Sequence, residues 1–194
     1  MQYPLELTFK WSLATSIEVT DSSGQLLFFL RQKMFKLKEI IGVFGDRERN
    51  NHKYEIKADR VIDFSARYNF SDTNGRVFGG VKRQGMKSIW KARYDIFGTG
   101  DEVKFTLTEK NPWVKVADAF FGEIPIVGMF TGFVFNPTYL ISDPSGKLVM
   151  SLEKKPSWFS RIFIVKKLDD LMEQEEAEVL LSMLMMILLE KNRG

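Results

Sequence analysis

Three pairs of basic residues recur along the chain, and aromatic residues lie near each pair. The pairs are Arg31 and Lys33, Lys82 and Arg83, and Lys154 and Lys155. Each basic residue near a membrane contributes about 1 kcal/mol of attraction to anionic lipid, so cations gathered on one surface would bind anionic phospholipid head groups. Lysines at strand ends also keep strand edges soluble, which is the plain structural alternative.

A second candidate for membrane contact is the segment between Asn111 and Gly122. Asn111 suits a helix N-cap, Pro112 suits the first helical position, and Gly122 suits the end of a helix. One apolar stripe at helical spacing contains Trp113, Val116, Ala117, Phe120 and Phe121. We therefore predict one short helix, with Trp113, Phe120 and Phe121 at a membrane interface. A helix that closes one end of a barrel is the alternative.

Groups that commonly perform catalysis or bind metals are sparse. The absence of cysteine excludes thiol catalysis, cysteine zinc sites and disulfide bonds. His52 is the one histidine, and its charged neighbours predict a surface loop. Residues 80–88 imitate a phosphate-binding loop, but the lysine comes one position late and a strand-like stretch follows it instead of a helix. We predict no catalytic residue, no metal and no cofactor.

The charge balance argues against nucleic acid as a partner. Lys and Arg number 28 and Asp and Glu 25, so the net charge of +3 is too small to identify a nucleic-acid-binding protein. The N-terminus lacks the pattern of a signal peptide, and no apolar run is long enough for a membrane-spanning helix. We therefore expect a cytoplasmic protein, with peripheral membrane contact left open.

The stretch Asp169–Glu178 contains six acids and no base. It lacks the alternating ligands and the sharp glycine turn of a calcium loop. Acids are favoured at the N-terminal end of a helix by the helix dipole, which is our interpretation of this stretch. Whether calcium binds there stays open.

A turn motif recurs three times and points to an all-β architecture. The copies are Thr20–Leu27, Ser71–Phe78 and Ser142–Val149, and each has the form Ser/Thr-Asp-x-x-Gly followed by a polar and two apolar residues. An aspartate that accepts backbone N–H groups and a glycine with positive φ close a short hairpin. Strand-like sequence lies on both sides of each copy. Matching the rest of the chain to strand-like sequence predicts roughly ten to twelve strands, enough for a closed barrel or a sandwich.

The stretch Val179–Leu189 decides between these two architectures. Ser182 is its only polar residue, so a helix here has no polar face. Such a helix has to be enclosed on all sides or lie in lipid. A sandwich covers only one side of a helix, whereas a wide barrel covers every side. We therefore predict a mainly β protein, a closed antiparallel barrel around a hydrophobic C-terminal helix, in one domain over residues 1–194.

These features resemble the Tubby C-terminal-like superfamily, most closely its LURP-one-related and phospholipid-scramblase-like group. The resemblance rests on the strand-turn-strand units, on the segment Gly122–Gly128, and on Leu168–Asp170 leading into Val179–Leu189. It covers most of the chain, and it implies a twelve-stranded antiparallel barrel around the C-terminal helix. Because these anchors are architectural, the resemblance supports the fold more than an activity.

The resemblance offers more than one function. Tubby-like members bind phosphoinositides, and scramblase-like members are linked to lipid movement and calcium. We expect a non-enzymatic binding module that recognises anionic lipid head groups, at a membrane surface, or a protein partner. A scramblase-like lipid-handling protein and an enzyme that uses a cleft on the barrel surface are the alternatives.

Overall fold

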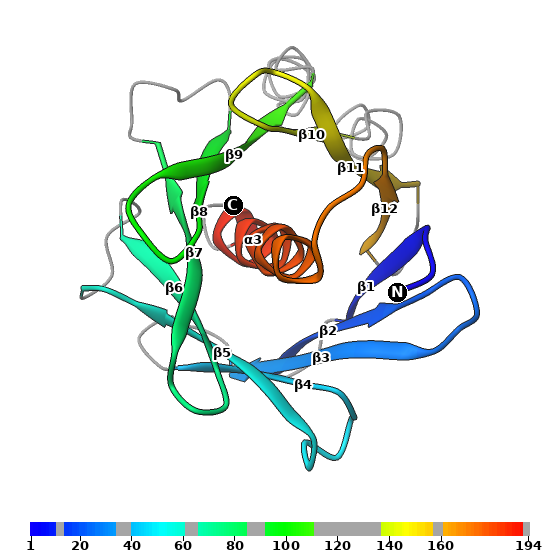
Figure 1. Ribbon diagram of the computed structural model, residues 1–194. Coiled ribbons are helices and arrows are strands. Elements are labelled where there is room, and N and C mark those ends of the chain that lie inside the picture. The colour runs from blue at the N-terminus through cyan, green and yellow to red at the C-terminus, as the bar shows by residue number, and fades with distance from the viewer. Residues whose placement is uncertain are drawn as a thin grey trace, which may run out of the picture.

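The computed structural model describes residues 1–10, 14–33, 40–60, 66–84, 92–110, 137–156 and 161–191. In these residues, twelve strands form a closed barrel around one helix (Figure 1). The elements are β1 (Leu5–Lys10), β2 (Ala14–Thr20), β3 (Leu26–Lys33), β4 (Ile41–Phe44), β5 (His52–Ala58), β6 (Arg67–Asp72), β7 (Val77–Arg83), β8 (Arg93–Phe97), β9 (Val103–Glu109), β10 (Thr138–Ser142), β11 (Leu148–Lys155), β12 (Arg161–Lys167) and α3 (Glu173–Lys191). The predicted mainly β barrel with a C-terminal helix is confirmed.

Every strand pairs antiparallel with its neighbours in sequence, and β1 closes the barrel by pairing with both β2 and β12. Connections therefore alternate between the two ends of the barrel. The turns after β2, β4, β6, β8 and β10 share one end with the link from β12 into α3. We call this end the entrance end and the opposite end the far end.

The three repeated motifs form the predicted hairpin turns, all at the entrance end. In the turn after β10, the Asp143 carboxylate accepts the backbone N–H groups of Ser145 at 2.9 Å and Lys147 at 3.0 Å. Gly146 takes a φ of 88°, and its N–H donates to the Asp143 carbonyl oxygen. The turns that contain Asp21 and Asp72 repeat this arrangement, with Gly24 and Gly75 also at positive φ.

Helix α3 runs inside the barrel, as its lack of a polar face predicts. Every residue from 176 to 189 is buried. The helix packs against inward-facing side chains that alternate along the strands, such as Leu5, Leu7 and Phe9 of β1. An α-helix rises 1.5 Å per residue, so these 19 residues extend about 28 Å through the core. The predicted second helix, with Trp113, Phe120 and Phe121, lies outside the described residues.

Candidate functional site

Within the described part of the chain, the entrance end carries two clefts of similar size, one on each side of the start of α3. The first, which we call the Phe105 cleft, has a volume of about 430 Å³. It is lined by Glu102, Val103, Lys104, Phe105, Asp143, Pro144, Val149, Asp169, Asp170, Leu171 and Glu175. Five of these eleven residues are acids and one is a cation, and most of the others are apolar. The cleft therefore combines an apolar lining with a negatively charged rim.

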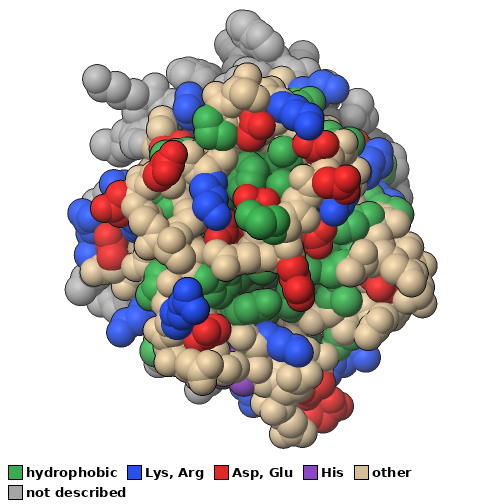
Figure 2. Space-filling model, in the orientation of Figure 1, with side chains coloured by type: hydrophobic (Ala, Val, Ile, Leu, Met, Phe, Trp, Pro, Cys, Tyr) green, Lys and Arg blue, Asp and Glu red, His purple; other side chains and the backbone are tan. Residues whose placement is uncertain are grey.

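The second cleft, which we call the Phe78 cleft, has a volume of about 420 Å³. It is lined by Tyr54, Asp72, Arg76, Phe78, Glu173, Gln174 and Ala177. The rings of Tyr54 and Phe78 lie 5.4 Å apart between centroids and give this cleft an aromatic wall. Burial raises the pKa of the Tyr54 phenol, and the nearby Glu173 adds to this effect. Figure 2 shows apolar surface in the hollows of this face, with charged side chains around them.

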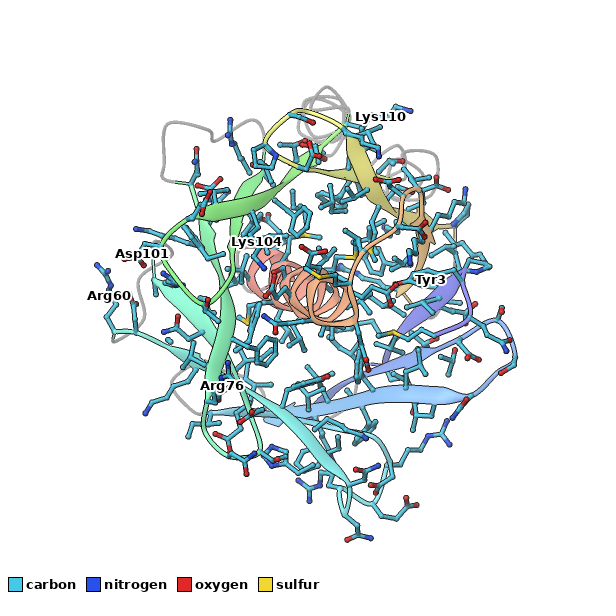
Figure 3. All side chains as sticks on the ribbon, viewed as in Figure 1. Tyr3, Arg60, Arg76, Asp101, Lys104 and Lys110 are labelled. Carbon is cyan, nitrogen blue, oxygen red and sulfur yellow. The ribbon has the colours of Figure 1, made fainter. Side chains whose placement is uncertain are left out.

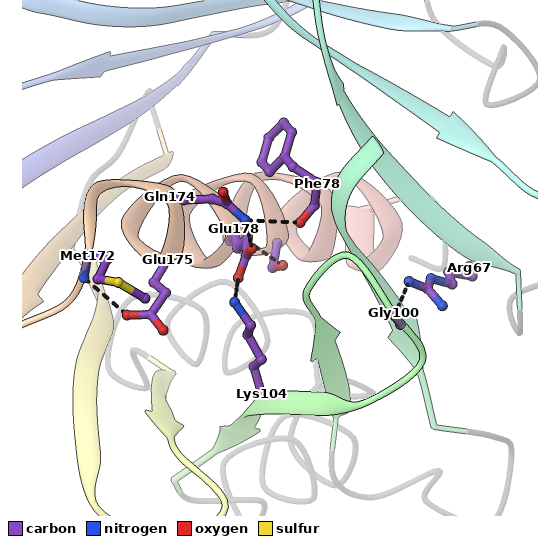
Figure 4. Close-up of polar contacts among 9 residues, drawn as sticks. Arg67, Phe78, Gly100, Lys104, Met172, Gln174, Glu175 and Glu178 are labelled. Carbon is purple, nitrogen blue, oxygen red and sulfur yellow. Dashed lines mark hydrogen bonds and ion pairs between the residues drawn. The ribbon is translucent and has the colours of Figure 1, made fainter. Parts of the chain in front are cut away.

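A chain of polar contacts ties α3 to the barrel wall between the two clefts (Figure 4). The Gln174 amide, in the Phe78 cleft, donates to a carboxylate oxygen of Glu178 at 2.9 Å. The other Glu178 oxygen lies 3.4 Å from the ammonium nitrogen of Lys104, which lines the Phe105 cleft. Figure 3 shows Lys104 directed inward toward α3, whereas Arg60 and Asp101 lie outside the barrel. These contacts fix the start of α3 relative to β9.

Glu178 is an acid buried in the core, with 0% of its surface exposed. Burial raises the pKa of its carboxyl group, while Gln174 and Lys104 act in the opposite direction. Room for the side chain comes from Gly79 of β7, where a Cβ would lie 2.9 Å from Cγ of Glu178. We interpreted Glu178 as one of the acids that the helix dipole favours, but its side chain is buried inside the barrel. The adjacent apolar run that begins at Val179 was the signal that pointed to burial.

The other acids of Asp169–Glu178 are distributed rather than gathered. Asp169 pairs with Lys147, which lowers the pKa of the Asp169 carboxyl group. Glu176 pairs with Lys167 at 2.8 Å. In the described part of the chain, no three His, Cys, Asp or Glu side chains converge in a way that could hold a metal ion.

The six cations proposed for lipid binding do not gather on one patch. They occur on β3, β7 and β11, which are every fourth strand of twelve and so lie a third of the barrel apart. Each pair lies at the last residues of its strand, which is the end farthest from the repeated turn. The three pairs are therefore arranged around the far end of the barrel. Arg31 is exposed, Lys82 is half-buried, and Lys155 is exposed and lies 3.6 Å from a Glu6 carboxylate oxygen. Lys154 is half-buried, and Lys33 is the last residue of β3.

Arg83 lies inside the barrel, with 4% of its side chain exposed. Its Nε atom is 3.4 Å from a Glu190 carboxylate oxygen near the end of α3, and its guanidinium lies over the Tyr94 ring. The Tyr94 hydroxyl donates to the same Glu190 oxygen at 2.6 Å. In this position Arg83 joins the helix to the barrel and faces away from solvent.

His52 begins strand β5 instead of lying in the predicted loop. It is half-buried, its ring lies 5.1 Å from that of Phe44, and its Nε2 atom is 3.1 Å from the Tyr54 carbonyl oxygen. His52 pairs with Phe44 of β4, so strand β5 begins at His52. The charged residues that precede it in sequence lie in the turn between β4 and β5. Among the described residues, no helix is both long and apolar enough to cross a membrane.

Comparison with known proteins identifies the family of this chain. No curated protein matches the chain. A crystal structure of a protein from Arabidopsis thaliana is similar, with 15% sequence identity, a TM-score of 0.49, and coverage of 98% of this chain and 92% of that chain. Residues 26–165, which span β3 to β12, match the family described as LURP-one-related. This match covers most of the chain and confirms the resemblance drawn from the strand-turn-strand units, so the protein belongs to the LURP-one-related family.

Proposed function

We propose that this protein is a non-enzymatic binding module and that it binds a protein partner through the entrance end of its barrel. Its family is generally non-catalytic. The observation that carries the proposal is a group of exposed apolar side chains at this end. Leu148, Leu168 and Met172 are 42%, 51% and 66% exposed. Leu148 precedes the cleft residue Val149 on β11, and Leu168 and Met172 lie in the same link from β12 to α3 as the cleft residues Asp170 and Leu171.

Apolar side chains exposed together, beside polar residues, are typical of protein-protein contact surfaces. Here they are combined with acids, because Glu102, Asp170 and Glu175 all line the neighbouring cleft. An acidic rim repels anionic lipid head groups. The entrance end therefore suits a protein surface better than a membrane surface.

Photo-crosslinking in the cells that make the protein tests this proposal. A photoreactive phenylalanine replaces Met172 at the entrance end or Ile40, which is 51% exposed and lies next to β4 at the far end. We expect a discrete protein adduct from the Met172 position and none from the Ile40 position. The absence of adducts at Met172, or the same adducts from both positions, would contradict the proposal.

Anionic lipid is the second candidate partner, and the far end is the place for it. Cations in a ring around one mouth of a barrel can all approach a flat membrane when the barrel stands on that mouth. Arg31, Lys82 and Lys155 have this arrangement. The test is flotation of the protein with vesicles of phosphatidylserine and phosphatidylcholine or of phosphatidylcholine alone.

We expect recruitment by the anionic vesicles only, weakening as salt shortens the Debye length from ~10 Å at 0.1 M to ~3 Å at 1 M. Replacing Arg31, Lys82 and Lys155 by alanine should abolish it. A matched triple replacement of Arg49, Lys53 and Arg76 removes the same charge from the entrance end and should leave recruitment intact. Equal recruitment of the two triple variants would exclude the far-end ring as the lipid site.

A further inference from the structure

We infer that the Phe105 cleft binds a lysine side chain of the partner, as an alkylammonium group whose methylene stem lies on the apolar lining and whose charge meets the acidic rim. This inference rests on the proposed function, because it names the chemistry by which the entrance end recognises a partner. The cleft volume of about 430 Å³ falls within the ~300–1,000 Å³ range of small-ligand sites.

The apolar lining comes from three separate elements that meet at the cleft. Val103 and Phe105 belong to β9, Val149 belongs to β11, and Leu171 lies between β12 and α3. Phe105 is 5% exposed and Val149 is 2% exposed, so the base of the cleft is formed by core residues held in place by packing. A flexible stem of methylene groups is complementary to such a surface, as lysine stems are elsewhere in proteins.

The charges of the rim favour a cation over an anion or a neutral group. Of the five lining acids, Asp143 accepts the N–H groups of its own turn and Asp169 pairs with Lys147. Among the described residues, no ion pair involves Glu102 or Glu175, and Asp170 is fully exposed at 3.7 Å from Lys167. The carboxylates of Glu102 and Glu175 are therefore available to a cation from outside.

Lys104, the single cation of the lining, is already committed to the buried Glu178 at 3.4 Å. It therefore does not compensate the negative charge of Glu102 and Glu175. Glu175 is fixed near the start of α3, because its carboxylate accepts the Met172 backbone N–H at 3.0 Å. One further acceptor atom on this carboxylate is open to a ligand ammonium group.

Titration with hexylammonium chloride, followed by backbone and methyl chemical shifts, tests the inference on the full chain. Hexanol and sodium hexanoate have the same apolar stem without the positive charge. We expect saturable shifts at Val103, Phe105, Val149 and Leu171 with hexylammonium, and binding of hexanol and hexanoate weaker by about tenfold or more, as loss of a charge-assisted contact implies.

Two double variants separate the rim from a general charge effect. Glu102→Gln with Glu175→Gln removes two rim acids and should weaken hexylammonium binding by about tenfold. Glu48→Gln with Glu55→Gln removes two acids from the β4–β5 hairpin and should leave it unchanged. Equal affinity for hexylammonium and hexanol, or equal binding by the two double variants, would overturn the inference.

Photo-crosslinking from Met172 keeps this inference distinct from the proposed function. A protein adduct from Met172 together with no saturable hexylammonium binding overturns the lysine chemistry and keeps the protein-binding module. Hexylammonium binding that depends on Glu102 and Glu175, without a protein adduct from Met172, supports the cleft chemistry and contradicts the proposed function.

Discussion

Gly79 of β7 faces Glu178 of α3 so closely that a methyl group at Gly79 would lie 2.9 Å from Cγ of the glutamate and 3.0 Å from the Phe97 carbonyl oxygen. The glycine in the wall thus makes the room that the buried acid of the helix occupies. This contact joins β7 and α3 beside the polar chain that also includes Gln174 and Lys104.

The first prediction concerns this contact. Gly79→Ala should lower the free energy of unfolding by about 1–3 kcal/mol, as overpacking of a core does. Glu178→Ala in the same chain should recover part of that loss, because it removes one of the two close neighbours. Urea unfolding of the two single variants and the double variant measures the coupling. Strictly additive effects would show that Gly79 and Glu178 do not constrain each other.

The second prediction concerns pH. Burial raises the pKa of Glu178 in the folded protein above its value in the unfolded chain. The stabilisation linked to the protonated acid is complete below the unfolded pKa and is lost as the pH rises through the folded pKa. Glu178→Gln keeps the side-chain size and removes this titration. The stability of Glu178→Gln relative to the natural protein should therefore increase from pH 4 to pH 7 in thermal unfolding.

A relative stability of Glu178→Gln that falls or stays constant over this pH range would mean that Lys104 and Gln174 compensate the burial of the charge. Lys104→Gln is the matched control, since it leaves Glu178 buried without its cation. It should steepen the loss of stability with rising pH.

The third prediction compares two methionines of the C-terminal segment. Met185 is fully buried inside the barrel, and Met172 is 66% exposed just before α3. Met185→Asp places an unpaired charge in an apolar core, which costs several kcal/mol out of a typical stability of 5–15 kcal/mol. It should yield protein without a cooperative thermal transition. Met172→Asp should unfold as the natural protein does.

Deletion of residues 174–194 should likewise prevent folding, because α3 fills the barrel. A truncated protein that unfolds cooperatively with near-native stability would contradict the role of α3 as the core.

The fourth prediction concerns the positive φ of the repeated turns. Gly75 has a φ of 77°, and a Cβ added there would meet no atom within 4 Å, so Gly75→Ala is strained only through its backbone. It should cost about 1–2 kcal/mol. Gly100→Ala is the control, since Gly100 has the same open surroundings without the positive φ, and it should be neutral or slightly stabilising. Equal effects in chemical unfolding would argue against a turn-specific requirement.

The fold was predictable because its strongest signals are local or depend on composition. Asp21, Asp72 and Asp143 indicate hairpins through their spacing to a glycine, and each forms one. The run Val179–Leu189 has no polar face and therefore requires an enclosing wall. Neither inference needs knowledge of which strands are neighbours.

The candidate site was not predictable, because it depends on register and on which end of the barrel each residue reaches. Lys104 lies in a strand of alternating polar and apolar residues. Nothing in the sequence around it indicates a contact with Glu178, which lies 74 positions later. Arg83 and Lys82 are adjacent in sequence, but the pleat of β7 directs Arg83 into the barrel. The predicted basic pair therefore combined a surface residue, Lys82, with an interior residue, Arg83.

The last prediction concerns the position of Arg83. Its guanidinium is 4% exposed and shares Glu190 with the Tyr94 hydroxyl, which donates at 2.6 Å. Removing one partner of a buried ion pair costs about 3–5 kcal/mol, and removing one hydrogen bond costs about 0.5–1.5 kcal/mol. Arg83→Leu should therefore destabilise the protein clearly more than Tyr94→Phe in urea unfolding. Lys82→Leu, on the neighbouring outward-facing position, should change the free energy of unfolding by less than about 0.5 kcal/mol. If Arg83→Leu and Lys82→Leu had equal effects, the Arg83–Glu190 contact would not anchor the end of α3, and Arg83 would be available to a ligand at the surface.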